Sequence, residues 1–163
     1  MAVNVNLNEY GFAVVPVHFR LRHSPNMRPL PYKIDTGANC TTISRDDLQS
    51  LGYDDNWIIS TGVLLVGDEQ PTLASGAPVD DCYRVALPEI NIGGWVGYNW
   101  PVLTSLTVPF RLLFGTDSMQ FFNWHFNYEN GVCRFELIPG KRKLLAGQQE
   151  QSIHSMDDTD KKV

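Results

Sequence analysis

The chain has 163 residues, of which 43% are hydrophobic and 19% charged, and this balance suits one globular domain with a real core. Its formal net charge of -5 argues against a nucleic-acid partner, because binding to phosphates needs a concentrated basic surface. No apolar run approaches the roughly 20 residues needed to cross a bilayer, and the N-terminus lacks the pattern of a signal peptide, so we expect no membrane partner.

The first third of the chain is predicted to be β structure followed by one short helix. Val3, Val5 and Leu7 alternate with asparagines, which is the period-2 pattern of a half-buried strand. The next apolar run contains Pro16, which indicates an edge position or a bulge. A proline-rich stretch is predicted to be a connecting loop at residues 24–31. The expected strands are residues 3–7, 12–21 and 32–34, and the expected helix is residues 45–51, between Ser44 and Gly52.

The rest of the chain continues the β pattern and ends in a polar segment. The apolar run at residues 63–66 is predicted to be a buried strand, and residues 67–79 are rich in Gly, Pro and Ser. From residue 146 the composition turns polar, so we expect one domain over residues 1–145 and a disordered tail over residues 146–163. Further expected elements are strands at 83–87, 90–92 and 111–115, a short helix at 116–122, and a hairpin at 125–137 around an Asn-Gly turn.

One acidic residue stands out in the segment Y-K-I-D-T-G-A-N-C-T-T-I-S, residues 32–44. Asp35 ends a short apolar strand, so its carboxylate is expected at the edge of the core, where it is poorly solvated. Thr36 adds a hydroxyl that needs a partner if it is buried, and Gly37 allows a tight turn. The tripeptide by itself fits an ordinary turn as well as a catalytic carboxylate.

Three segments, taken in order, resemble the retropepsin-like aspartic proteases, a family of single-domain proteases that includes retroviral enzymes and cellular and bacterial relatives. The segment I-D-T-G-A-N-C-T-T-I-S, residues 34–44, resembles the active-site motif. The small residues around Ser75 and Gly76 stand where the family places its flap. The segment L-L-F-G-T-D-S-M, residues 112–119, resembles the glycine-ended strand that packs beside the active-site loop in this family. The resemblance implies a mostly β, single-domain acid-protease barrel with one or two short helices.

The resemblance also implies an activity, that of an aspartic endopeptidase acting on an extended polypeptide. In this chemistry two carboxylates share a proton and activate a water molecule, and only Asp35 has the required motif. The resemblance therefore implies a two-fold homodimer that pairs two copies of Asp35. Thr36 and Gly37 would form the active-site loop. The implied substrate-binding residues are Ala38, Asn39, Ser75 and Gly76.

Two departures keep an alternative open, namely a non-catalytic dimeric module of the same fold that binds peptides or serves as a scaffold. Asn39 and Cys40 stand where viral relatives commonly carry acidic residues. The segment from Trp95 to Pro109 has no place in the family pattern, and its tryptophans are expected in the core or an interface. Substituting Asp35 by Asn would separate the two functions.

The cysteines and histidines show no spacing typical of a metal site or a disulfide framework. Cys40, Cys82 and Cys133 are odd in number and widely separated, which indicates reduced thiols and a cytoplasmic location. The four histidines lack ligand spacing, and no C-x-x-C or H-E-x-x-H motif is present. We therefore expect no metal and no other cofactor.

Overall fold

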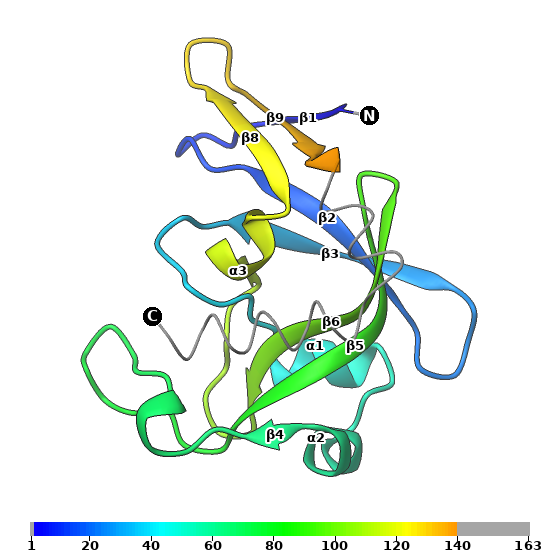
Figure 1. Ribbon diagram of the computed structural model, residues 1–163, viewed down its shortest axis with the longest axis vertical. Helices are drawn as coiled ribbons and strands as arrows, with labels where there is room; N and C mark the ends of the chain where they lie inside the picture. The colour runs from blue at the N-terminus through cyan, green and yellow to red at the C-terminus, as the bar shows by residue number, and fades with distance from the viewer. Residues whose placement is uncertain (1, 140–163) are drawn as a thin grey trace.

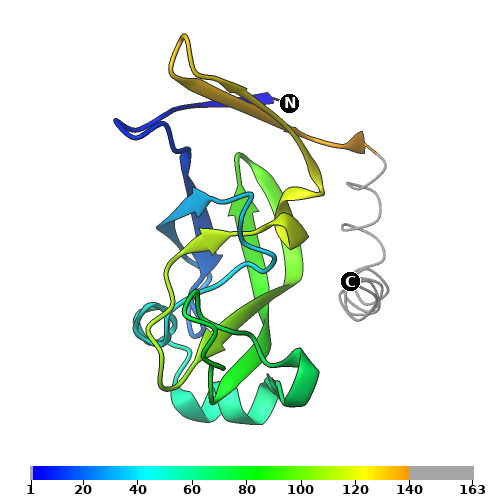
Figure 2. The same ribbon diagram turned by 90° about the vertical axis from the view of Figure 1, so that its left-hand side faces the viewer.

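The computed structural model describes residues 2–139, which form two β-sheets. Figures 1 and 2 show the smaller sheet at one end of the molecule and the larger sheet below it. The smaller sheet is antiparallel, in the order β1 (Ala2–Asn6), β9 (Val132–Leu137), β8 (Phe122–Asn127). The larger sheet follows the order β4 (Val63–Leu64), β5 (Cys82–Ile92), β2 (Val14–Arg20), β3 (Met27–Ile34), β7 (Leu113–Phe114), with β6 (Trp95–Ser105) paired to β5.

Strands β5 and β6 form a long hairpin that accounts for the segment the sequence pattern left unplaced. They pair from Cys82↔Ser105 to Ile92↔Trp95, and the turn uses Gly93 and Gly94, both with positive φ. On its other side β5 pairs with β4 near its start and with β2 near its end. Trp100 of β6 is 2% exposed and contacts Trp95 edge to face. The expectation that these tryptophans belong to the core is confirmed.

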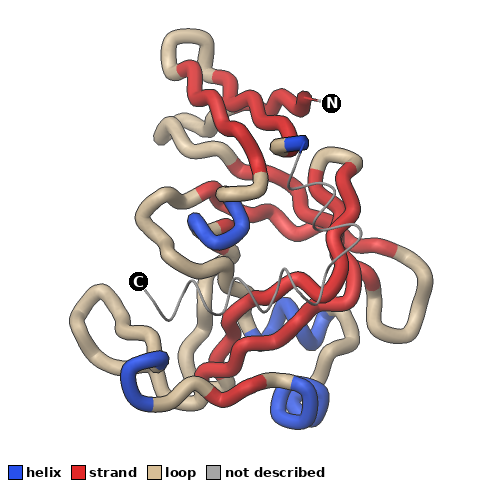
Figure 3. Tube along the Cα trace, viewed as in Figure 1, coloured by secondary structure: helices blue, strands red, loops and turns tan. Residues whose placement is uncertain are grey.

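The helices are few and short, and Figure 3 shows them among strands and loops. Two of them start at side-chain caps, because Ser44 Oγ accepts a hydrogen bond from the Asp47 N–H and Asp54 Oδ1 accepts one from the Trp57 N–H. The mostly β fold class is confirmed. The sequence predicted one or two short helices, and the helix at Asp55–Thr61 was not among them. The helical elements are α1 (Arg45–Ser50), α2 (Asp55–Thr61), a 3₁₀ turn (Gly67–Glu69) and α3 (Thr116–Met119).

The expected loop at residues 24–31 is wrong, because β3 already begins at Met27. The prolines fit because of the direction of their nitrogen atoms. The Ile34 N–H donates to Ala13 next to β2, whereas the Lys33 N–H donates to Leu112 on the opposite side. Backbone nitrogens of alternate residues in a strand point to the same side. Pro29 and Pro31 lie four and two residues before Lys33, so their nitrogens also face away from β2. Within residues 2–139, β3 pairs on that side only at its last two residues, and no hydrogen bond is lost at either proline.

Other sequence-based elements differ from the structure in length or burial. The buried strand expected at residues 63–66 is wrong, because β4 has two residues and Val63 and Leu64 are 60% and 44% exposed. The strand expected at 111–115 is shorter in the structure, where it is β7, and the helix expected at 116–122 is also shorter, where it is α3. The hairpin expected at 125–137 is confirmed as β8 and β9.

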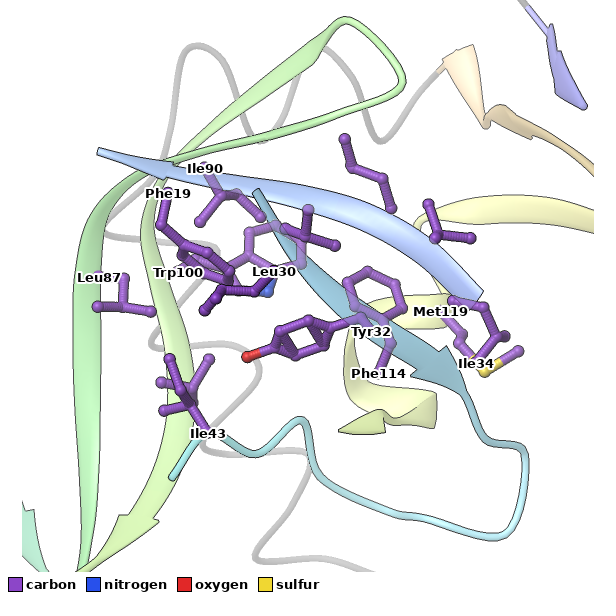
Figure 4. Close-up of a cluster of buried hydrophobic side chains, with 14 of the residues drawn as sticks. Phe19, Leu30, Tyr32, Ile34, Ile43, Leu87, Ile90, Trp100, Phe114 and Met119 are labelled. Carbon is purple, nitrogen blue, oxygen red and sulfur yellow. The ribbon is translucent and has the colours of Figure 1, made fainter. Parts of the chain in front are cut away.

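The main core lies around the inner face of β2 and β3, where Figure 4 shows Tyr32 and Ile34 among apolar side chains. Tyr32 is fully buried and contacts the Phe114 ring edge to face at 6.3 Å between centroids. Phe114 belongs to β7, so this contact packs the end of β3 against its parallel neighbour. The core thus fixes the strand that leads directly into Asp35.

Several sequence-based expectations concern features outside this core. The tail expected at residues 146–163, and the domain boundary before it, lie outside the described residues. Within residues 2–139 the structure holds no helix of a length and apolarity that would cross a membrane. None of the three cysteines forms a disulfide.

Candidate active site

Asp35 is positioned by the end of strand β3. Tyr32 and Ile34 are buried on one face of this strand, and the Ile34 N–H donates to the Ala13 carbonyl at 3.0 Å. The Asp35 N–H donates to the Phe114 carbonyl of β7 at 3.1 Å. Asp35 is half-buried, and the two residues after it, Thr36 and Gly37, are exposed. The strand therefore ends with a half-buried carboxylate at the edge of the core.

The loop after β3 closes on the carboxylate itself. The Gly37 N–H donates to Asp35 Oδ1 at 2.9 Å, and the Ala38 N–H donates to the Asp35 carbonyl at 3.2 Å. A Cβ at position 37 would lie 3.2 Å from Asp35 Oδ1, closer than most such contacts, so glycine lets the amide approach. Within the described residues Oδ1 has this partner and Oδ2 accepts no hydrogen bond. One oxygen is held, and the other is available for chemistry.

The segment from β7 to α3 packs against this loop, as the resemblance implied. Strand β7 runs parallel to β3, with Lys33 opposite Leu113 and Ile34 opposite Phe114. The Thr116 N–H donates to the Ala38 carbonyl at 2.9 Å. A Cβ at Gly115 would lie 2.6 Å from the backbone carbonyl of Cys40, nearer than real Cβ atoms come. The glycine is required because two backbone segments meet there.

A buried polar network braces the same loop. Thr41 Oγ1 donates to Asp117 Oδ1 at 2.8 Å and accepts from the Gly115 N–H at 3.1 Å, while the Thr41 N–H donates to Asp117 Oδ2 at 3.1 Å. Ser118 Oγ lies 2.6 Å from Thr41 Oγ1 and accepts from the Trp100 indole N–H at 3.0 Å. If Ser118 donates to Thr41, each hydroxyl has a donor and an acceptor, so the network is fully satisfied.

Sequence reasoning missed this network. Asp117 lacks the motif of Asp35, because Ser118 and Met119 follow it in place of Thr-Gly. The structure gives its carboxylate a positioning role through Thr41. Asp117 also lies close enough to Tyr32 to add to the rise in the pKa of that phenol, which comes first from burial and then from Asp47 and Asp117. No periodic pattern in the sequence signals these contacts, because the partners are 76 or 77 residues apart.

Cys40 is the last residue of the 35–40 loop and packs against an apolar cluster. It packs, partly buried, against the small second core formed by Leu65, Val79, Cys82 and Leu103. Within that cluster burial raises the pKa of the Cys82 thiol to about 11, although Arg84 opposes the rise. Cys40 therefore contributes an apolar contact between the loop and this cluster.

The candidate flap is an exposed turn at the tip of residues 70–79. Leu73 and Ala77 are joined by a 2.8 Å backbone hydrogen bond, and Thr72 bridges to Pro78. Gly76 has φ +88 and nothing within 4 Å of an added Cβ, so the tip is open. Figures 1 and 2 show this turn on the same side of the molecule as the 35–40 loop. The structure thus gathers Asp35, Thr36, Gly37, Ala38 and Asn39 in one loop and leaves Ser75 and Gly76 on a separate tip.

Among the described residues, Asp35 is the one carboxylate that lies in an Asp-Thr-Gly motif and has an oxygen without a hydrogen bond. The Asp117 carboxylate is occupied by Thr41 and by the Ser118 N–H. No group of three or more His, Cys, Asp or Glu side chains in residues 2–139 is arranged to hold a metal ion. A single carboxylate cannot act at once as the base for water and as the acid for a carbonyl. In residues 2–139 the arrangement therefore offers one such carboxylate, that of Asp35.

Comparisons with known proteins bear on the fold. Protein-family profiles give no match, and curated protein sequences give none either. Among solved structures, a retropepsin-like aspartic protease from Rickettsia conorii is similar with a TM-score of 0.56 and 16% identity, over 83% of this chain and 90% of that chain. The retroviral protease-like domain of Ddi1 from Leishmania major is similar with a TM-score of 0.43 and 10% identity, over 78% and 94%. The likeness to the rickettsial protease shows that this chain has a retropepsin-like fold.

Proposed function

We propose that the chain is an aspartic endopeptidase that works as a two-fold homodimer, with Asp35 of each copy forming the catalytic pair. The observation that carries this proposal is the half-site itself. In this half-site one carboxylate oxygen of Asp35 is held by the Gly37 amide, the other accepts no hydrogen bond within residues 2–139, and Thr36 beside it is exposed. In a two-fold dimer, Asp35 of the second copy supplies the other carboxylate, and no further acidic residue is needed in the sequence.

The reaction follows from pairing the two carboxylates. Two like charges this close do not both ionise, so the pair holds one proton. The ionised Asp35 takes a proton from a bound water, whose oxygen attacks the peptide carbonyl carbon, while the protonated partner hydrogen-bonds to the carbonyl oxygen and then protonates it. The tetrahedral intermediate collapses when a proton moves to the amide nitrogen, the C–N bond breaks, and an acid and an amine are released.

The other residues of the site have positioning roles in this proposal. Thr36 donates a hydrogen bond across the two-fold axis and fixes the two loops together. Ala38 and Asn39 present polar groups to the backbone of an extended peptide, which binds as an added strand. Ser75 and Gly76 close over the peptide and exclude water. We also propose a cytoplasmic location, supported by three cysteines none of which forms a disulfide.

A second candidate is a dimeric module of the same fold that binds peptides without cleaving them. One observation favours it. The Cys40 side chain packs, partly buried, against an apolar cluster, and its thiol is a weaker hydrogen-bonding group than a carboxylate for a substrate backbone. The two candidates differ in what they require of Asp35, because binding needs only its shape and cleavage needs its acid–base chemistry.

The deciding experiment is digestion of a diverse peptide library, followed by mass spectrometry, from about pH 4 to 8. The parent protein is compared with Asp35→Asn and with a matched control, Asp68→Asn, which removes an exposed carboxylate elsewhere. We expect cleavage by the parent and the control and none by Asp35→Asn. A folded, dimeric parent that cleaves nothing would refute the protease and favour the binding module.

A further inference from the structure

An exposed aromatic cluster lies next to the 35–40 loop and has no role in the mechanism above. We call it the aromatic patch and define it as Tyr10, Phe12, Phe126 and Tyr128. Tyr10 and Tyr128 are 74% and 71% exposed, and Phe12 is 42% exposed. The Tyr10 and Phe12 rings are 6.5 Å apart, and Phe126 stacks on Tyr128 at 6.3 Å. Large aromatic side chains gathered at the surface in this way mark interaction sites more often than isolated exposed ones do.

The patch joins two turns that are distant in the sequence. The first turn links β1 to β2, and the second links β8 to β9. A Cβ added at Gly11 would lie 3.8 Å from Tyr128 Cε1, which is ordinary van der Waals contact. The Leu7 N–H donates to the Gly131 carbonyl at 2.8 Å, so a backbone hydrogen bond holds the turns together. The Tyr128 ring therefore lies beside Gly11, between Tyr10 and Phe12 in the sequence, and the two turns are adjacent on the surface.

Both turns are held in shape before anything binds. Asn8 Oδ1 accepts from the N–H groups of Tyr10 and Phe12 at 3.0 and 2.9 Å. Asn127 Oδ1 accepts from the Asn130 N–H at 3.0 Å in the second turn. From Phe114 in the core, a series of ring contacts runs outward along one face of β8 through Trp124, Phe126 and Tyr128. Little conformational entropy is lost when such a surface is covered, which favours binding.

The patch is continuous with the half-site. The Ala13 carbonyl, next to Phe12, accepts the hydrogen bond from Ile34, the residue before Asp35. Lys33 pairs with Val14 across the strands, and its Nζ lies 3.8 Å above the Phe12 ring, a cation–π contact. Figures 1 and 2 show the turn between β1 and β2, the tip of the β8–β9 hairpin and the 35–40 loop along the same side of the molecule.

We propose that the aromatic patch is part of the surface on which a second copy of this chain docks. The inference rests on the proposed function, which requires a partner's Asp35 opposite this one. A second copy whose Asp35 lies opposite this one across a two-fold axis also covers the surface next to the 35–40 loop. An isologous interface must be self-complementary, and this region carries the exposed carboxylate of Glu9 as well as the ammonium of Lys33. Charges of both signs let the same surface face itself.

The test is the dimer dissociation constant, measured by sedimentation equilibrium. The variant Tyr10→Ser with Tyr128→Ser removes the two most exposed rings of the patch. The matched control is Ile59→Ser with Val66→Ser, which removes side chains of similar exposure, 53% and 64%, far from the patch in sequence. We expect the dissociation constant to rise about tenfold or more for the patch variant, because buried aromatic residues dominate interface energies, and to stay at the parent value for the control.

A second measurement holds even if the patch variant fails to fold. Hydrogen–deuterium exchange of the parent is compared at concentrations where it is dimeric and where it is dilute. We expect dimerisation to slow exchange in residues 8–14 and 126–131, and not in α2. Unchanged exchange in both turns, or an unaltered dissociation constant in a folded patch variant, would overturn the proposal. So would a parent that stays monomeric at every concentration.

The outcomes also separate this surface from the proposed chemistry. Asp35→Asn is expected to dimerise like the parent while losing cleavage. A parent that dimerises through the patch without cleaving any peptide would refute the protease and leave the docking surface standing. A parent that cleaves, and whose dimer is indifferent to Tyr10 and Tyr128, would refute the docking surface and leave the protease standing.

Discussion

Gly115→Ala is a small change for which the structure predicts a large effect beside the 35–40 loop. The added Cβ would lie 2.6 Å from both the carbonyl carbon and the carbonyl oxygen of Cys40, and 2.9 Å from the Ala38 oxygen. Favourable carbon–carbon contacts lie at about 3.5–4.0 Å, so the overlap is about 1 Å. All three contacting atoms belong to the backbone, and no rotamer change relieves them. The 35–40 loop or strand β7 has to move.

We expect Gly115→Ala to lower the free energy of unfolding by about 2–3 kcal/mol, at the upper end of the cost of overpacking, because the contacting atoms are backbone. For a domain of this size that corresponds to a melting temperature roughly 5–10 °C lower. If the proposed function holds, displacing the loop by about 1 Å also lowers kcat by about a hundredfold. Urea unfolding and peptide turnover measure the two effects on the same preparation.

The matched control is Gly67→Ala. Gly67 has φ +59 but nothing within 4 Å of an added Cβ, so this substitution carries only the backbone strain of a positive φ, about 1 kcal/mol. Its turnover is expected to equal that of the parent. If Gly115→Ala cost no more stability than Gly67→Ala, the close approach of β7 to the loop would not exist as described, and the account of the half-site would be refuted.

Three further predictions concern the network, the surface and the second core. Thr41→Val should lower the free energy of unfolding by about 1–3 kcal/mol in urea titrations, because it leaves buried polar partners unpaired, whereas Thr72→Val, at an exposed position, should leave it nearly unchanged. Asp55 accepts hydrogen bonds from Arg45, and this lowers the pKa of its carboxyl. The pair therefore stabilises the fold above about pH 4 and loses that effect as pH falls through the lowered pKa. Asp55→Asn should show a smaller drop in melting temperature over that range, and an identical drop would contradict the assignment. The Cys82 thiol, with its pKa raised to about 11, should resist iodoacetamide at pH 8 in the folded protein and react in urea, as mass spectrometry would show.

The parts of the fold that sequence could predict are those fixed by neighbouring residues. The alternation around Val3 and Val5 gave β1, and the Asn130-Gly131 turn gave the β8–β9 hairpin, because both patterns act over a few residues. The cap at Ser44 likewise marked the start of α1. The position of Asp35 at a strand end was predicted for the same reason, since an apolar strand followed by Asp-Thr-Gly has to leave the core there.

The parts that sequence could not predict depend on distant partners. Pro29 and Pro31 are compatible with β3 because their nitrogens face away from β2, on the side where, within residues 2–139, β3 pairs only from Lys33 onward, and that orientation is set by the register with β2. The run at residues 63–66 is apolar but mostly exposed, because β4 lies at the edge of the sheet. The bonds of Thr41 to Asp117 join residues 76 apart, a contact that no local pattern carries.

The packing of Cys40 accounts for a cysteine at a position where the sequence departs from the viral pattern. Its side chain contacts the cluster that contains Val79, and the Val79 N–H donates to the Pro71 carbonyl at 2.9 Å, at the base of the exposed turn. The residue after the loop and the base of the candidate flap therefore share one apolar cluster. An acid at position 40 would place a partly buried charge beside this apolar cluster, which costs desolvation free energy. A cysteine here thus adds an apolar contact between the loop and the turn, and a carboxylate at this position is not needed for the catalytic role proposed for Asp35.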